Sequence, residues 1–291
     1  MSIAANMREN RHVDHSEVSD LESRAQEFET PCGAGSMVWR KWGQGSPLLL
    51  LHGGSGSWLH WLKTIPVFEQ HHSVWVPDLP GMGDSDLPDE PYEAEPYAAV
   101  VKAGFESLVT ASGPIDVIGF SFGAGIAGCI GCLMDGRFRH LVLSGANYYE
   151  PHLIRRRPNL LRLKRIDDPA ARLQAVRNNL REMMVHHEKN IDELALHLYT
   201  TDTARRRLPR VSFSGFATLR GDLSRLKLQG RLTAISGADD QIIGHDAAGQ
   251  AAQLRILRPE AQYHAIADAG HWVMYEGAQG YNAALLRALA D

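Results

Sequence analysis

The sequence predicts an α/β fold built on a mostly parallel central sheet flanked by helices. From about residue 28, short apolar runs alternate with longer helix-like stretches, which is typical of strands joined by crossover helices. Several runs are apolar throughout, as in Leu48–Leu51, and this pattern indicates strands buried on both faces. With 291 residues, 44% of them hydrophobic, the chain is long enough for one large core and an added segment.

Seven strands are expected from the apolar runs. In chain order they cover Met37–Trp42, Pro47–His52, Ser73–Leu79, Ile115–Phe120, His140–Gly145, Leu232–Ser236 and Gln262–Ala267. Residues 1–27 are expected to form an N-terminal extension, with one helix over Asp20–Phe28.

The alternation stops between Asn147 and about Leu226, where polar helical sequence takes its place. Helices are expected there over Ala170–His187 and Asn190–Tyr199. The chain therefore divides into a core of residues 28–147 and 227–291 and a helical insertion of residues 148–226, which lies between two strands of the sheet.

The insertion is basic, whereas the core is acidic. Residues 148–210 contain 12 Arg and 2 Lys against 8 Asp and Glu, a net charge of +6 in a chain whose net charge is −4. Arginine runs such as Arg155–Arg157 and Arg205–Arg207 are most often solvated helix faces. The alternative is that one or two of these arginines overhang a functional site and attract an anionic substrate.

A candidate nucleophile follows the strand Ile115–Phe120. Gly119–Gly123 has the form Gly-x-Ser-x-Gly, and its glycines allow a sharp turn from strand to helix that exposes the hydroxyl of Ser121. A serine hydroxyl attacks poorly by itself, so this role requires a base and an orienting acid further along the chain.

The base and the acid are expected after the last two strands. His271 follows the final strand, at the sheet edge where open α/β sheets place their ligands. Asp239 and Asp240 follow the strand before it, and one of them can accept the Nδ1–H of the imidazole. Adjacent side chains point in different directions, and the Gly-x-x-Asp spacing from Gly237 favours Asp240.

An oxyanion site is expected in the glycine-rich turn after the strand Pro47–His52. The backbone N–H groups of such a turn can face developing negative charge beside the N–H of Phe122, and Gly54 is the favoured second donor. The residues expected to line the substrate pocket are Ser55, Phe120 and Trp272.

Together these motifs resemble the α/β-hydrolase family from about Met37 to the C-terminus. Ser121, Asp240 and His271 occur in the chain order of that family's catalytic triad. The turn Asp78–Ser85 is similar to a structural turn of the family. The resemblance implies a Ser-His-Asp triad, an oxyanion hole, a cap formed by the helical insertion, and neither a cofactor nor a metal.

Other chemistries fit the sequence less well. Gly123–Gly128 matches a GxGxxG dinucleotide fingerprint, but the next strand ends without the required carboxylate, and close helix packing explains these glycines better. No P-loop or HExxH zinc motif occurs. Cys129 and Cys132 have CxxC spacing within an apolar helix, which favours small buried thiols over redox or metal chemistry.

Acyl transfer to water is the expected reaction, with a carboxylic ester of a small molecule as the default substrate. The second hypothesis is carbon–carbon bond hydrolysis, because the His52–Gly56 turn and Gly270–Trp272 with Glu276 resemble hydrolases of aromatic ring-cleavage products. Phe120 departs from their pattern, which typically has asparagine there. A cofactor-free perhydrolase ranks third, and a small-ligand receptor that keeps the hydrolase fold is the alternative of another class. A serine nucleophile argues against the haloalkane dehalogenase and epoxide hydrolase branches.

The chain as a whole gives no signal for a nucleic-acid or membrane partner, since its net charge is −4 and no run of 18 apolar residues occurs. The polar N-terminus has no apolar segment of the kind that directs secretion, so a cytoplasmic protein is expected. Expected partners are a small-molecule substrate, neutral or anionic, and a second copy of the chain.

Overall fold

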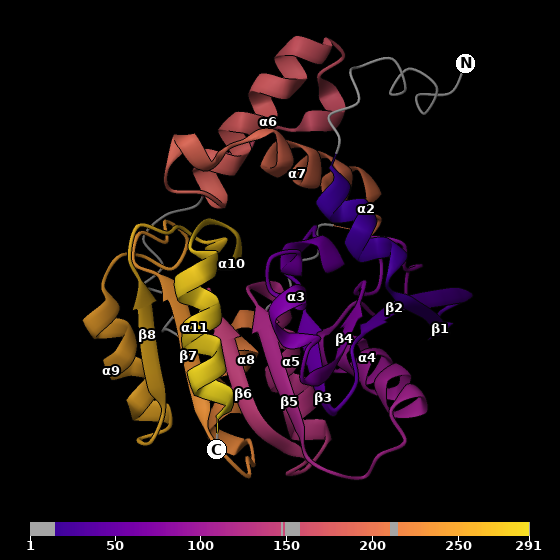
Figure 1. The fold of residues 1–291 in the computed structure, drawn as a ribbon, viewed down its shortest axis with the longest axis vertical. Coiled ribbons are helices and arrows are strands. Elements are labelled where there is room, and N and C mark those ends of the chain that lie inside the picture. Colours follow the sequence, from indigo (N-terminus) through magenta and orange to yellow (C-terminus); the bar gives the residue numbers. More distant parts are fainter. Residues whose placement is uncertain (1–14, 147, 149–157, 210–214, 291) are drawn as a thin grey trace.

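The computed structural model describes residues 15–146, 148, 158–209 and 215–290. Within these ranges, eight strands form one sheet in the order β1-β2-β4-β3-β5-β6-β7-β8 (Figure 1). The β1–β2 and β2–β4 pairs are antiparallel and all other pairs are parallel. This arrangement confirms the predicted α/β class with a mostly parallel sheet.

The seven predicted strands all form, and the structure adds one before them. The strands are β1 (Gln26–Cys32), β2 (Gly35–Trp42), β3 (Ser46–Leu51), β4 (His72–Pro77), β5 (Ile115–Phe120), β6 (Phe138–Ser144), β7 (Leu232–Gly237) and β8 (Gln262–Ile266). The side chains of β3 alternate between two cores, with Leu48 and Leu50 on one face and Leu49 and Leu51 on the other. Strand β3 is therefore buried on both faces, as its apolar run predicts.

Helices cover both faces of the sheet. One face carries α4 (Ala94–Leu108), α5 (Phe122–Leu133), α8 (Gly215–Arg225) and α9 (Ala247–Leu257). The other carries α3 (Ile65–Phe68), α10 (Val273–Glu276), α11 (Ala278–Leu289) and the short 3-10 helix η1 (Trp58–Trp61). None of the described helices is long and apolar enough to cross a membrane.

The helical insertion, called the cap below, lies above the carboxyl ends of the strands (Figure 1). It contains α6 (Pro169–Met183) and α7 (Glu193–Arg205), with 3-10 turns at η3 (Leu163–Arg165) and η4 (Glu188–Asn190). Asp168 caps α6 by accepting the N–H of Ala171 at 2.7 Å, and Asp192 caps α7 by accepting the N–H of Ala195 at 2.8 Å. Both helices expected in the insertion are thus present, and an aspartate N-cap marks the start of each.

The helix expected over Asp20–Phe28 is wrong in its second half. Helix α2 covers Ser16–Ser23, and the chain then forms β1, which pairs with β2 along its whole length. A two-residue connection turns the chain back, and Gly33 within it has a φ of +56°, the backbone region that tight hairpin turns need. Residues 26 and 27 therefore belong to the sheet and not to an N-terminal extension.

The boundary expected for the insertion at residue 226 also needs correction, because α8 packs on the core. Leu219, Leu223 and Leu226 lie in the same buried cluster as Ile126 and Ile130 of α5. A Cβ added at Gly128 would lie 2.6 Å from Cδ1 of Leu219. The cap therefore ends before α8, and close helix packing accounts for this glycine of the GxGxxG pattern.

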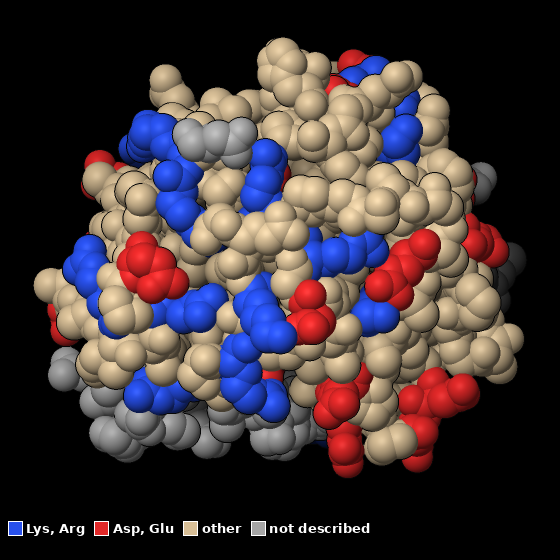
Figure 2. Space-filling model, turned by 90° about the horizontal axis from the view of Figure 1, so that it is seen from below, with Lys and Arg blue, Asp and Glu red and all other residues tan. Residues whose placement is uncertain are grey.

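Basic side chains are not confined to the cap. Figure 2 views the molecule from the end opposite the cap and shows Lys and Arg gathered across that face. Strands β6 and β7 begin near this end. Arg137 precedes β6, and Lys227 and Arg231 precede β7. The core is acidic in total charge, yet Lys and Arg cover much of its lower face, with Asp and Glu gathered toward one edge (Figure 2).

Candidate active site

Three side chains from separate segments form one hydrogen-bonded chain. Ser121 lies between β5 and α5, Asp240 follows β7, and His271 follows β8. Nε2 of His271 lies 3.0 Å from Oγ of Ser121, and Nδ1 of His271 lies 2.8 Å from Oδ2 of Asp240. His271 is 2% exposed and Asp240 is 0% exposed, whereas Ser121 is half-buried. The serine hydroxyl is thus the accessible end of the chain.

The backbone at Ser121 is strained in the way that a sharp strand-to-helix turn requires. Its φ is 50° and its ψ is −112°, and its N–H donates to the carbonyl of Ser144 at 2.8 Å. A Cβ added at Gly119 would lie 2.5 Å from Cα of Ala124, and one added at Gly123 would overlap the carbonyl oxygen of Leu51. Both flanking glycines are therefore needed for close approach of the backbone.

We expect Gly123→Ala to lower the free energy of unfolding by about 1–3 kcal/mol, because the new methyl group must displace strand β3 or helix α5. Denaturant unfolding measures the change. Gly113→Ala is the matched control, since a Cβ there meets no heavy atom within 4 Å. Equal stability of the two variants would contradict this account of the turn.

The carboxylate of Asp240 is the one that reaches the imidazole. Its Oδ1 accepts the backbone N–H groups of Ile242 at 2.8 Å and Ile243 at 3.1 Å, which leaves Oδ2 for His271. Asp239 instead donates its N–H to the carbonyl of Ala269 at 3.0 Å, and its side chain is half-buried. The geometry agrees with the choice of Asp240 over Asp239.

The turn Gly53–Ser57, called the oxyanion turn below because an oxyanion donor is expected in it, lies beside the start of α5. The N–H of Gly53 donates to Nδ1 of His60, and the N–H of Ser55 donates to Sδ of Met82. The N–H of Gly56 donates to the carbonyl of Gly53. Among the described residues, the N–H of Gly54 has no acceptor. A Cβ on Gly54 would lie 3.5 Å from Cβ of Phe122. The two expected oxyanion donors are therefore neighbours.

Two of the three residues expected to line the substrate pocket lie beneath the site instead. Phe120 and Trp272 are each 1% exposed, and both rings pack against His60 at centroid distances of 5.4 and 5.3 Å. Phe120 also packs against His271 at 5.0 Å. Their position supports the base and the oxyanion turn from below, while Ser55 is half-buried at the turn itself.

Glu276 ties the cap to the loop that carries His271, a role that the sequence did not show. Its carboxylate accepts the N–H of Gly270 at 2.7 Å together with the N–H groups of His186 at 2.8 Å and His187 at 2.7 Å. Nδ2 of Asn190 donates to it at 2.9 Å. Four donors from two segments thus meet on one carboxylate.

The second arginine run fastens the cap to the turn after β4. Arg207 donates to the carbonyls of Gly83 at 3.1 Å and Ser85 at 2.6 Å, and Arg205 lies 3.2 Å from Asp84. Arg205 and Arg207 are both solvent-exposed, and both are bound to that turn. The run Arg155–Arg157 lies outside the described residues.

The cysteines and histidines of the described chain form no metal site. Groups of three or more His, Cys, Asp or Glu side chains with metal-binding geometry are absent from the part of the chain that the structure describes. Cys129 and Cys132 are free thiols, and burial raises the pKa of Cys129 to about 12. Cys129 is buried, as expected for a small thiol in this helix, whereas Cys132 is half-buried.

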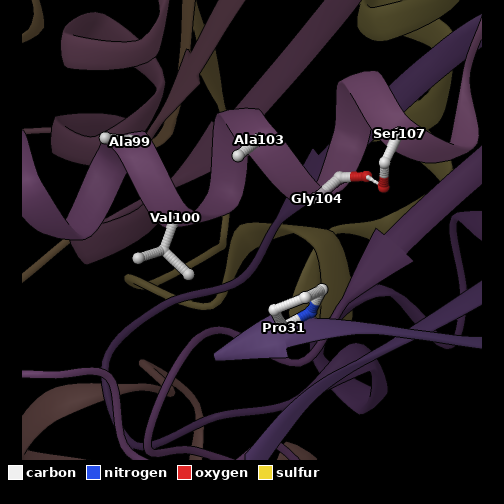
Figure 3. Close-up of a pocket in the computed structure, with 6 residues that line it drawn as sticks. All are labelled: Pro31, Ala99, Val100, Ala103, Gly104 and Ser107. Atoms are coloured by element: carbon white, nitrogen blue, oxygen red, sulfur yellow. Dashed lines mark hydrogen bonds between the residues drawn. The ribbon is translucent and has the colours of Figure 1, made fainter. Parts of the chain in front are cut away.

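An apolar hollow of about 520 Å³ opens elsewhere, between α4 and β1 (Figure 3). Its lining residues are Pro31, Ala99, Val100, Ala103, Gly104 and Ser107. None of these belongs to the segments that carry Ser121, Asp240 or His271. The hollow is therefore separate from the candidate active site.

Comparison with known families agrees with this arrangement. A family model described as "alpha/beta hydrolase fold" matches residues 46–278, which include all three residues of the hydrogen-bonded chain. The chain belongs to the α/β hydrolase fold family.

Curated relatives match this member of the α/β hydrolase fold family over local segments. A soluble epoxide hydrolase from Corynebacterium sp. (strain C12) is 37% identical over 87 residues, 29% of each chain. A 2-hydroxy-6-oxo-2,4-heptadienoate hydrolase from Pseudomonas putida is 31% identical over 108 residues, 36% of this chain and 38% of the relative. These matches therefore cover well under two thirds of either relative.

Solved α/β hydrolase structures align over nearly the whole chain. A protein from Burkholderia cenocepacia assigned as an aryl esterase has a TM-score of 0.71 at 23% identity, covering 91% of this chain and all of that one (100%). A meta-cleavage product hydrolase from Pseudomonas fluorescens IP01 has a TM-score of 0.69 at 20% identity, with 90% and 96% covered. At these identities the similarity shows the shared fold alone.

Proposed function

We propose that the protein is a serine hydrolase that cleaves a carboxylic ester of a small molecule through an acyl-enzyme. The observation that supports this most strongly is the hydrogen-bonded chain from Ser121 through His271 to Asp240. An accessible hydroxyl, a base within reach of its proton and a buried carboxylate behind the base are the three parts of a nucleophilic mechanism.

In the proposed reaction, Nε2 of His271 takes the proton of Ser121 as Oγ attacks the ester carbonyl. Asp240 accepts the Nδ1–H, which keeps Nε2 free to accept and stabilises the imidazolium. The backbone N–H groups of Gly54 and Phe122 receive the oxyanion. The imidazolium then returns its proton to the leaving alcohol, and water repeats the cycle to release the acid and restore Ser121.

Carbon–carbon bond hydrolysis is the second candidate, and the local sequence similarity to a 2-hydroxy-6-oxo-2,4-heptadienoate hydrolase favours it. The ester remains the first choice, because phenylalanine occupies position 120, beside the base, where the ring-cleavage hydrolases typically carry asparagine. Epoxide hydrolysis is not proposed, despite the local similarity to an epoxide hydrolase, because Ser121 has no carboxylate that could form an alkyl-enzyme ester.

A substrate panel separates these candidates. We expect purified protein to hydrolyse p-nitrophenyl esters of short acids with saturation kinetics, and to hydrolyse a 2-hydroxy-6-oxo-dienoate slowly or not at all. Turnover of the dienoate alone would favour carbon–carbon cleavage. Calorimetric binding of these ligands without turnover would favour a receptor and contradict the proposed hydrolase.

A further inference from the structure

A carboxyl group of the cap is buried against the oxyanion turn. Asp202 of α7 is 2% exposed, and its Oδ1 accepts the hydroxyl of Ser57 at 2.6 Å. Its Oδ2 is buried and has no hydrogen-bond partner among the described residues. A buried polar atom without a partner is costly, so this contact between cap and core calls for an explanation.

Two residues on the core side connect Asp202 to the oxyanion turn. Ser57 closes the turn and accepts the N–H of Leu59 at 3.2 Å, which caps η1. His60 lies beneath the turn, where its Nδ1 accepts the N–H of Gly53 at 3.2 Å and its ring fills the space that a Cβ on Gly56 would need. The turn is therefore held from both of its ends.

The unused oxygen of Asp202 faces the other nitrogen of His60. Because Nδ1 accepts a hydrogen bond, neutral His60 carries its proton on Nε2, and this atom lies 3.8 Å from Oδ2 of Asp202. Burial lowers the pKa of His60 well below its ordinary value, and His52 and His271 lower it further. His60 is thus a neutral side chain that bonds Gly53 and lies in contact with the cap carboxyl.

We infer that Asp202 is a positioning residue that, through Ser57 and His60, holds the oxyanion turn in the conformation in which Gly54 can serve as donor. The oxyanion site is then complete only when α7 of the cap is docked. This inference rests on the proposed function, in which Gly54 stabilises the oxyanion formed by Ser121.

The protonation state of Asp202 gives the contact a pH dependence. Burial raises its pKa to about 8, the charge of Asp78 acts in the same direction, and Ser57 and Arg205 oppose the shift. The charged and titratable groups that face it are Asp78, Arg205 and His60. Because the raised pKa means that docking favours the neutral acid, docking weakens as the pH rises from about 4 to about 8. Above pH 8 the contact holds a buried charge.

The test compares substitutions at Asp202 with one at Asp168, an exposed cap carboxylate that caps α6. We expect Asp202→Ala to lower kcat for p-nitrophenyl acetate about tenfold to a hundredfold, with KM within about twofold, because a misplaced donor affects the transition state. The affinity for a trifluoromethyl ketone, whose serine adduct carries an oxyanion, falls by a similar factor. Asp168→Ala leaves all three values within about twofold.

Asp202→Asn provides a rescue and a pH test, since its amide remains a neutral acceptor for Ser57. We expect it to recover most of the kcat lost in Asp202→Ala and, because an amide does not ionise, to remove the loss of kcat that wild-type protein shows as the pH approaches about 8, where docking has become weakest. If Asp202→Ala does not fold, Ser57→Ala breaks the same contact from the core side. This variant is also expected to lower kcat while KM stays within about twofold of the wild-type value.

Three results would overturn the inference. The first is that Asp202→Ala keeps the kcat and the ketone affinity of the wild-type protein. The second is that Asp168→Ala loses as much kcat and ketone affinity as Asp202→Ala. The third is an alkaline decline that persists in Asp202→Asn. Wild-type protein that neither hydrolyses the ester nor binds the ketone would instead overturn the proposed function, and this inference with it.

Discussion

Ser121→Ala is expected to lower kcat for ester hydrolysis by a factor on the order of 10⁴ to 10⁶ while the protein stays folded. The hydroxyl is half-buried and bonded to His271 at 3.0 Å, so its removal takes away the nucleophile without opening a cavity in the core. Steady-state kinetics on p-nitrophenyl acetate, together with thermal unfolding of both proteins, measure the two effects separately.

Ser107→Ala is the matched control for this substitution. Ser107 lies on α4, where its hydroxyl donates to the carbonyl of Gly104 at 2.8 Å. We expect its variant to retain wild-type kinetics. Ester turnover by Ser121→Ala within tenfold of wild type would exclude Ser121 as the nucleophile, and with it the acyl-enzyme mechanism.

Asp240→Asn is expected to lower kcat by about 10⁴ with little change in structure. The asparagine can keep the two bonds to the N–H groups of Ile242 and Ile243, but its NH₂ group then faces His271 in place of Oδ2. The imidazole must carry its proton on Nε2 to accept that bond at Nδ1. Nε2 can then no longer accept the proton of Ser121.

The neighbouring carboxylate supplies an internal control. Asp239→Asn is expected to leave kcat within about twofold, because the carboxylate bonded to Nδ1 of His271 is that of Asp240. A large loss in Asp239→Asn with near-normal kcat in Asp240→Asn would reverse the assignment of the acid. The pH dependence of kcat for both variants, measured between pH 5 and 9, adds an independent comparison.

Most of the sheet could be predicted because most of its strands contain an apolar run, such as Leu48–Leu51 of β3. Strand β1 was missed because Gln26, Glu27 and Glu29 are residues that favour helices, and no apolar run marks the strand. Its conformation depends on pairing with β2 across a tight turn, and such pairing overrides local preference. The end of the cap was misplaced for a similar reason, since α8 is assigned to the core by contacts with α5.

The three residues of the hydrogen-bonded chain could be predicted because each follows a strand in a recognisable turn. The residues around them could not, since adjacency in sequence does not tell whether a side chain points into a pocket or into the core. Phe120 and Trp272 show this, because both are buried under the site. The sequence could not show the contacts of Glu276 and did not single out Asp202, because most partners of these two residues are far away in the chain.

The sequence by itself determined the α/β class, the chain order of the seven apolar runs, and the position of Ser121, His271 and the pair Asp239 and Asp240 at one edge of the sheet. Local patterns suffice for these features, because parallel strands bring their carboxyl ends together whatever lies between them. Only the tertiary structure decided which carboxylate bonds the imidazole, where the cap ends, and how Glu276 and Asp202 tie the cap to both sides of the site. Those features depend on distances between segments far apart in the chain, which no local pattern encodes.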